Sequence, residues 1–309
     1  MIELRVAESV ADLDRWARIK SAVAPNEPVT ADQLAATAEP DRLLLLASVR
    51  GVDAGCGIAA LSSFAGCAFI AARVLHPFRR RGVGTALLDA LAEHGRALGR
   101  DGVSAFVEDG DDESLAFARR FGLEETDYQL EQIRVVGKDE TPPVVPAGFE
   151  LVSLAGRRRE LLRAAWEQVA LDGYADMPLP GPATFRLDTW LRDEATRPDG
   201  SFVALEQGAV VGYAGLMEHA NGDATAEHGL TAVRRDRRRR GIARALKTAQ
   251  LHWAAGAGVV ELVTWTQKGN EAMQALNRSL GYRDHSKVLT MQGRLPAAAL
   301  DDQPTPQLA

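Results

Sequence analysis

The 309-residue sequence has only two cysteines and no hydrophobic run long enough to cross a membrane. Two thiols, Cys56 and Cys67, cannot form a disulfide framework, and their spacing matches no metal site. A membrane-spanning helix needs about 20 consecutive apolar residues. The N-terminus, Met1–Arg5, also lacks the charged and then apolar pattern of a secretion signal. These absences predict a cytoplasmic protein with no resident metal and no membrane partner.

The sequence also lacks a broad basic region. Its net charge is −6, and residues 1–140 hold 16 Lys and Arg against 23 Asp and Glu, whereas residues 141–309 hold 20 against 19. Proteins that bind nucleic acid usually present an extended positive surface. The charge balance therefore argues against a nucleic-acid partner, and the local arginine clusters are better explained by a small polyanionic ligand.

Two short segments, one in each half of the chain, have nearly the same sequence. Residues 79–84 are Arg-Arg-Arg-Gly-Val-Gly, and residues 238–243 are Arg-Arg-Arg-Gly-Ile-Ala. Each follows an apolar run and precedes an amphipathic stretch, which predicts a loop between a strand and a helix. Glycine allows close approach to the backbone, and the N–H groups of such a loop and of the next helix attract anions. The segments therefore predict two phosphate or pyrophosphate sites.

The similarity between the halves extends beyond these loops. The offset of 159 residues between Gly82 and Gly241 also pairs Val74 with Val233 and continues to Gly122 with Gly281. A single repeat of this length indicates two domains rather than a solenoid. A polar, proline-rich stretch over 137–147 predicts the boundary between them. We therefore expect domains over 1–140 and 146–296, with a flexible tail over 297–309.

Each half shows the same order of predicted elements. Helices come first, then antiparallel strands, then alternating strands and helices, which is typical of a mixed α/β fold. Apolar residues at helical spacing predict long helices over 83–98 and 242–255. The predicted last strands, over 127–136 and 287–293, are each expected to close the sheet of their own half.

The loops differ from the two common phosphate-binding motifs. Neither glycine is followed by the Lys-Ser/Thr pair of a Walker loop, and the Gly-x-Gly-x-x-Gly spacing of the Rossmann fold is absent. The Arg-x-x-Gly-x-Gly/Ala pattern instead resembles the acyl-CoA-binding motif of the GNAT (GCN5-related N-acetyltransferase) superfamily. The segment from Asn270 to Tyr282 is similar to a later motif of that family, and the segment from Asp111 to Leu123 is a weaker counterpart.

This resemblance implies two tandem GNAT folds, each an α/β (α+β) unit with a mixed, mostly antiparallel sheet flanked by helices, as in bacterial tandem-GNAT proteins. It also implies that acetyl-CoA lies between the fourth and fifth strands of such a fold and that an amine attacks its thioester directly. The predicted cofactor-binding residues are Val74, Arg79, Arg80, Arg81, Gly82, Val83 and Gly84 in the first half and Val233, Arg238, Arg239, Arg240, Gly241, Ile242, Ala243 and Asn270 in the second.

The candidate general base is Glu227, which precedes Gly241 by the spacing of the catalytic glutamate in the histone-acetyltransferase branch of the superfamily. A half-buried carboxylate would have a raised pKa suited to this role, although an exposed glutamate at a strand edge is the simpler alternative. His228 would point to the opposite face of the strand and remains a second candidate. In the first half the matching residues are Ala68 and Phe69, which cannot transfer a proton.

A general acid is harder to identify. Many members of the superfamily carry a tyrosine four residues before the glycine that ends the last helix, and here those positions are Asn277 and Ala118. Asn277 could donate a hydrogen bond near the sulfur of CoA. Water would then protonate the CoA thiolate that leaves. Tyr213 and Tyr174 are weaker alternatives. We therefore expect the second half to be catalytic, with Glu227, Asn277 and His228 as its candidate residues, and the first half to be degenerate.

The acceptor is less constrained than the donor. The loop that carries Asp172, Tyr174 and Asp176, with Trp190 and Trp265, could shape a site for a cationic amine on a small molecule or a peptide. The expected function is acetyl transfer from acetyl-CoA to a primary amine by a monomer or homodimer. Two alternatives stay open, a non-catalytic acyl-CoA sensor and an acyltransferase that uses a longer acyl chain.

Overall fold

The structure is a computed structural model of the chain. It describes residues 1–25, 28–178 and 185–296. The predicted tail over 297–309 lies outside the described residues.

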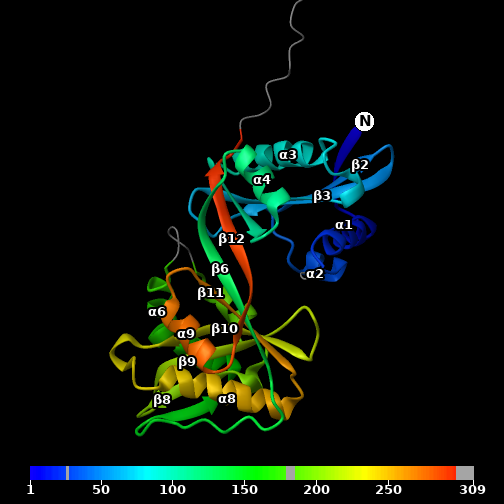
Figure 1. The fold of residues 1–309 in the computed structure, drawn as a ribbon. Helices are drawn as coiled ribbons and strands as arrows, with labels where there is room; N and C mark the ends of the chain where they lie inside the picture. The colour runs from blue at the N-terminus through cyan, green and yellow to red at the C-terminus, as the bar shows by residue number, and fades with distance from the viewer. Residues whose placement is uncertain (26–27, 179–184, 297–309) are drawn as a thin grey trace, which may run out of the picture. The chain divides into compact units, whose positions relative to one another are not determined.

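The chain forms two compact units. The described part of unit 1 consists of residues up to 126 and residues 289–296, and the described part of unit 2 consists of residues between 127 and 288. Each unit contains a mixed, mostly antiparallel sheet flanked by helices (Figure 1), which confirms the predicted fold class.

The sheet of unit 1 has the order β1-β2-β3-β4-β5, followed by the part of β12 over 289–294. Strands β1 to β4 pair antiparallel, whereas β4 and β5 are parallel. The strands are β1 (Ile2–Val6), β2 (Leu43–Val49), β3 (Val52–Leu61), β4 (Cys67–Val74), β5 (Gly102–Glu108) and β12 (Arg283–Arg294).

Helices cover both faces of this sheet (Figure 1). Trp16 of α1 packs with Leu44 of β2 on one face, and Leu91 of α3 lies against Gly57 of β3 on the other. Because both faces are covered, β2 is apolar along most of its length. The helices are α1 (Val10–Val23), α2 (Ala31–Ala36), α3 (Val83–Ala97) and α4 (Asp112–Arg120).

The sheet of unit 2 has the order β7-β8-β9-β10-β11-β6. Its strands also pair antiparallel, except for the parallel pair β10 and β11. The sequence did not predict the short β7, nor β1 in unit 1. The strands are β7 (Glu150–Ser153), β8 (Phe202–Glu206), β9 (Ala209–Glu218), β10 (Thr225–Val233), β11 (Glu261–Gln267) and β6 (Glu124–Val135).

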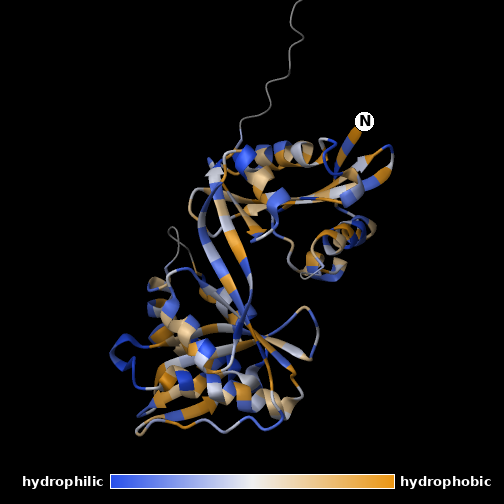
Figure 2. Ribbon diagram, in the orientation of Figure 1, coloured by the Kyte–Doolittle hydropathy of each residue, from blue (hydrophilic) through white to orange (hydrophobic). Residues whose placement is uncertain are grey.

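Helices pack on both faces of this sheet as well. One face carries an aromatic cluster of Trp166, Trp190 and Tyr213, and the other packs Ile242 and Leu246 of α8 against β8 and β9. The strands between the two layers of helices, such as β9, are correspondingly rich in apolar residues (Figure 2). The helices are α5 (Arg158–Ala165), a π-helical turn (Trp166–Ala170), α6 (Leu171–Ala175), α7 (Leu187–Asp193), α8 (Ile242–Ala257) and α9 (Glu271–Ser279).

The last strand of each sequence half contributes to the unit formed mainly by the other half. β6 pairs antiparallel with β11, from Val135 opposite Glu261 to Gln129 opposite Gln267. Residues 289–294 of β12 belong to unit 1. The prediction that 127–136 closes the sheet of the first half is therefore wrong. The prediction that 287–293 closes the sheet of the second half is also wrong, because residues from 289 onward belong to unit 1, where β12 lies next to β5. The alternating pattern of a strand fixes which face is buried, but it does not identify the neighbouring strand.

Candidate active site

The two arginine–glycine loops have the same backbone conformation. The φ angles of Arg80 and Arg239 are 59° and 60°, and those of Gly82 and Gly241 are 84° and 82°. The glycines are the N-caps of α3 and α8, and no side chain of the described residues caps either helix. The N–H groups of each first helical turn therefore stay available to an anion such as a pyrophosphate.

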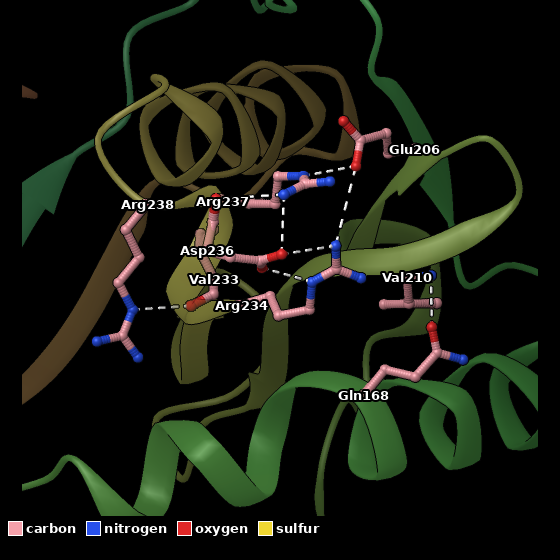
Figure 3. A network of polar contacts seen from close by, with 8 residues as sticks. All are labelled: Gln168, Glu206, Val210, Val233, Arg234, Asp236, Arg237 and Arg238. Atoms are coloured by element: carbon pink, nitrogen blue, oxygen red, sulfur yellow. Dashed lines mark hydrogen bonds and ion pairs between the residues drawn. The ribbon is translucent and has the colours of Figure 1, made fainter.

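The first arginine of each loop donates a hydrogen bond to the end of the strand that precedes the loop. Arg79 Nε donates to the carbonyl oxygen of Val74 at 3.3 Å. Arg238 Nε donates to the carbonyl oxygen of Val233 at 3.0 Å (Figure 3). Since these bonds fix the end of the strand relative to the loop, both arginines support the backbone that would hold the anion.

Four of the other arginines near the second loop form two pairs. Arg234 and Arg237 contact the Glu206 carboxylate at 3.9 and 2.6 Å (Figure 3). Arg239 and Arg240 are exposed, and neither makes a hydrogen bond or ion pair with another described residue. The second pair can therefore reach a polyanionic ligand without breaking an existing contact.

The first loop is similarly arranged. Arg80 and Arg81 are exposed, and the Arg81 guanidinium lies 5.9 Å from the centroid of the Phe78 ring. Val83 and Ile242, which begin the two helices, are almost fully buried. These apolar residues anchor each helix start to its core, so the loop is held at both ends.

Each loop follows a pair of parallel strands that separate. In unit 2, residues 225–227 of β10 pair with residues 261–263 of β11, although β10 continues to Val233. In unit 1, residues 67–69 of β4 pair with residues 102–104 of β5, and β4 also continues past the last pair. The separation leaves the later part of each strand unpaired on that side, where the sequence predicts acetyl-CoA.

A β-bulge distinguishes the two units. The pairing of β10 with β9 shifts between His228 and Thr231. The pairing of β4 with β3 is continuous, from Ala68 opposite Leu61 to Val74 opposite Gly55. A bulge adds one residue to one strand, so β10 is one residue longer than β4 between equivalent points.

This extra residue corrects the alignment of the two halves. Glu227 pairs with the third residue of β11, and Phe69 pairs with the third residue of β5. The match of Glu227 with Ala68 is therefore wrong by one residue, because the gap-free offset fails before the bulge. Phe69 occupies the position of Glu227, and Ile70 occupies that of His228; neither can transfer a proton.

Glu227 is a half-buried carboxyl group beside the point where β10 and β11 separate. Burial raises its pKa to about 7, and the negative charge of Glu131 contributes further. Glu131 comes from β6, and its carboxylate accepts a hydrogen bond from the Ser286 hydroxyl at 2.6 Å. A carboxyl group with a pKa near neutrality can both accept and release a proton at physiological pH.

A second buried carboxyl group, Glu194, was not found from the sequence. It follows α7, and its Oε1 accepts the hydroxyl of Tyr213 at 2.9 Å and the backbone N–H of Leu230 at 3.2 Å. Burial raises the pKa of Glu194 to about 7, although these hydrogen bonds oppose the shift. No local spacing marks this residue, because its partners lie on two strands further along the chain.

The His228 side chain lies on the opposite face of β10 from that of Glu227. Its Nε2 is 2.5 Å from the hydroxyl oxygen of Tyr282, and Lys247 Nζ lies 5.3 Å from the centroid of the Tyr282 ring. Burial lowers the pKa of His228 well below its usual value, and the Lys247 charge adds to the effect. The structure thus places His228 in a buried polar cluster against α8 rather than beside Glu227.

Asn277 is fully buried in α9. Its Nδ2 donates to Gln132 Oε1 at 2.9 Å, and Gln132 Nε2 donates to Asp284 Oδ1 at 2.8 Å. Asn270 is the N-cap of the same helix, with no side-chain capping bond to a described residue. The Asn277 amide therefore contacts β6, the strand contributed by the first half of the sequence.

The acidic residues predicted near the acceptor are already paired with arginines. Asp172 lies 3.1 Å from Arg235, and Asp176 lies 2.7 Å from Arg235 and 2.6 Å from Arg238. Trp190 is buried, and its ring N–H donates to a backbone carbonyl of α5 at 3.1 Å. The carboxyl group at the point where the pairing of β10 with β11 ends is instead that of Glu227.

The sequence profile of the Acetyltransferase (GNAT) family matches residues 9–123 and 160–282. The chain belongs to this family. A mycothiol acetyltransferase from Thermobispora bispora is 26% identical over 215 residues, which cover 68% of this chain and 70% of that protein.

Solved GNAT structures share the fold of this family member along almost its full length. A GCN5-related N-acetyltransferase from Sphaerobacter thermophilus is 19% identical, covers 96% of both chains and has a TM-score of 0.73. A tandem GNAT protein from the clavulanic acid biosynthesis pathway is 21% identical, with a TM-score of 0.74 and coverage of 96% of this chain and 99% of the other. The predicted tandem GNAT architecture is therefore confirmed.

Acetyl-CoA is the acyl donor of GNAT acetyltransferases. The chain has suitable features to receive its anionic part, since both loops lead into helices whose N-termini are uncapped by side chains of the described residues. Among the described residues, no helix is both long enough and apolar enough to span a membrane.

Proposed function

We propose that this GNAT protein transfers an acetyl group from acetyl-CoA to a primary amine, and that unit 2 carries out the reaction. The observation that supports this most directly is the position of Glu227. Its carboxyl group has a pKa raised to about 7 and lies where β10 leaves β11, on the strand that leads into the second arginine–glycine loop.

The proposed reaction is a direct attack of the amine nitrogen on the thioester carbonyl. Glu227 takes a proton from the incoming ammonium, and the new C–N bond forms as the amine nitrogen attacks. The C–S bond then breaks to release the thiolate of CoA, and the nitrogen loses its second proton to water to become the amide. General-base catalysis of this kind contributes about 10²- to 10⁴-fold. Binding both reactants in the right geometry supplies a further part of the rate enhancement.

No residue of unit 2 is assigned as general acid in this proposal. The Asn277 amide donates to Gln132, and the Tyr213 hydroxyl donates to Glu194. Burial also raises the pKa of Tyr213 well above its usual value. We therefore assign protonation of the thiolate to water.

Unit 1 is proposed to bind CoA without turnover or to serve as structural support. Its loop matches that of unit 2 in φ angles, but Phe69 occupies the position of the base. Because one relative is a mycothiol acetyltransferase from Thermobispora bispora, a substrate screen should include the amine that this relative acetylates.

The test is an acetylation assay on a panel of primary amines, with release of the CoA thiol as the readout. We expect E227Q to lower kcat by about 10²- to 10⁴-fold. The matched control is E218Q, the same change at an exposed carboxyl group at the end of β9. Full turnover by E227Q would contradict the assignment, and binding of acetyl-CoA without turnover on any amine would favour a sensor.

A further inference from the structure

The bulge in β10 interrupts the hydrogen-bond ladder between β9 and β10. Regular pairing holds up to His228 opposite Leu216 and resumes at Thr231 opposite Ala214. Backbone groups between these points need other partners, because buried N–H and C=O groups are costly when unpaired. Two buried side chains, one from each face of the sheet, supply these partners.

Glu194 supplies the acceptor on one face. Its Oε1 receives the Leu230 N–H at 3.2 Å. The carboxylate also lies directly over two glycines, since a Cβ on Gly215 or Gly229 would come within 1.9 Å of Oε1. The space for the carboxylate therefore depends on the absence of side chains on both strands beside the bulge.

Gln250 supplies the donor on the other face. Its Nε2 donates to the carbonyl oxygens of Ala214 at 3.3 Å and Gly215 at 2.9 Å, and the residue is fully buried in α8. In unit 1, where β4 has no bulge, the residue at the offset of 159 is the apolar Leu91. The buried glutamine is thus present only in the unit that has the bulge.

The bulge also determines the direction of Glu227. Side chains alternate between the two faces of a strand. If the same sequence paired with β9 without the bulge, every β10 residue before the bulge would shift by one position and its side chain would point to the opposite face. Glu227 precedes the bulge, whereas Val233 and the loop that it leads into follow it. A stable bulge is therefore required for the base and the loop to serve the same site.

We propose that Glu194 is a positioning residue, which holds the β10 bulge through its bond to Leu230 and so keeps Glu227 directed at the reacting groups. This inference rests on the function proposed for unit 2. In this role Glu194 acts as a hydrogen-bond acceptor of a given length, and its charge is not required.

Two substitutions distinguish the length of the Glu194 side chain from its negative charge. E194Q keeps a carbonyl oxygen at the same distance and removes the charge, whereas E194D keeps the charge and withdraws the acceptor by one methylene. We expect E194Q to retain kcat near that of the wild type. We expect E194D to lower kcat on the order of 10²-fold, as a displacement of about 1 Å in a site can do, with a smaller change in KM for acetyl-CoA.

Hydrogen exchange of the Leu230 amide provides a readout independent of activity. It should be slow in the wild type and in E194Q and faster in E194D, with E218Q as the control. If no amine is acetylated by the wild type, the proposed function fails, whereas the exchange pattern still tests the contact. The inference is overturned if E194D is active and E194Q is not, if the Leu230 amide exchanges equally in both, or if E194Q abolishes the pH dependence of kcat.

Discussion

Arg238 Nη2 lies 2.6 Å from Asp176 Oδ2, so the arginine that braces the second loop also holds the segment that follows α6. Arg238 Nε at the same time contacts the end of β10 through the carbonyl oxygen of Val233. One side chain therefore connects the predicted donor-binding loop with the segment predicted to face the acceptor. That segment is not the predicted loop throughout, because its first part forms α6.

The first prediction compares the two bracing arginines. We expect R238A to raise KM for acetyl-CoA by about 10- to 150-fold, because the loss of a hydrogen bond from a charged group costs about 1.5–3 kcal/mol. The matched variant R79A, which removes the equivalent bond to Val74 in unit 1, should leave the kinetics unchanged. Steady-state kinetics at varied acetyl-CoA checks both. The reverse result would make unit 1 the catalytic unit.

The second prediction concerns the buried Lys247. Burial lowers its pKa to about 7, whereas the unfolded chain keeps a lysine near its ordinary value. The unfolded state therefore binds more protons between about pH 7 and pH 10, and this residue makes the folded state less stable as the pH falls through that range. We expect K247M to be more stable than the wild type at pH 7, with the difference shrinking towards pH 10.

Chemical denaturation at pH 7, 8, 9 and 10 measures this effect. The matched control is L88M, because Leu88 is the residue at the corresponding position of α3. A wild type that is more stable than K247M at pH 7 would show that the Lys247 ammonium is stabilised in the fold.

The third prediction follows from the position of β6. A fragment over 127–288 keeps the pairing of β6 with β11, and a fragment over 141–288 loses it. The shorter fragment also leaves the Asn277 amide without Gln132. We expect the longer fragment to unfold cooperatively on heating and the shorter one to lack a cooperative transition, as followed by circular dichroism. Equal transitions in both would show that β6 does not stabilise unit 2.

The sequence predicted those parts of the site that depend on neighbouring residues. The loops at Gly82 and Gly241 could be recognised because the arginines, the glycine and the following helix lie within a few residues of one another. Glu227 could be proposed because its distance from Gly241 along one strand and loop is fixed.

Features that depend on pairing between distant segments could not be predicted. The bulge after His228 adds one residue whose presence shows only in the register with β9. Glu194 reaches Leu230 through the packing of α7 on the sheet. The strand that pairs with β6 could not be predicted either, because the alternating apolar residues of β6 would fit the edge of either sheet.

The pH dependence of kcat/KM in the wild type and in E227Q tests the central assignment most directly. Because the base must be deprotonated, the wild-type rate should rise with pH through an apparent pKa of about 7, the value to which burial and Glu131 raise the carboxyl group of Glu227. In E227Q the remaining rate should be low and should lack this rise. A profile in E227Q with the wild-type rise and rate would show that another group is the base.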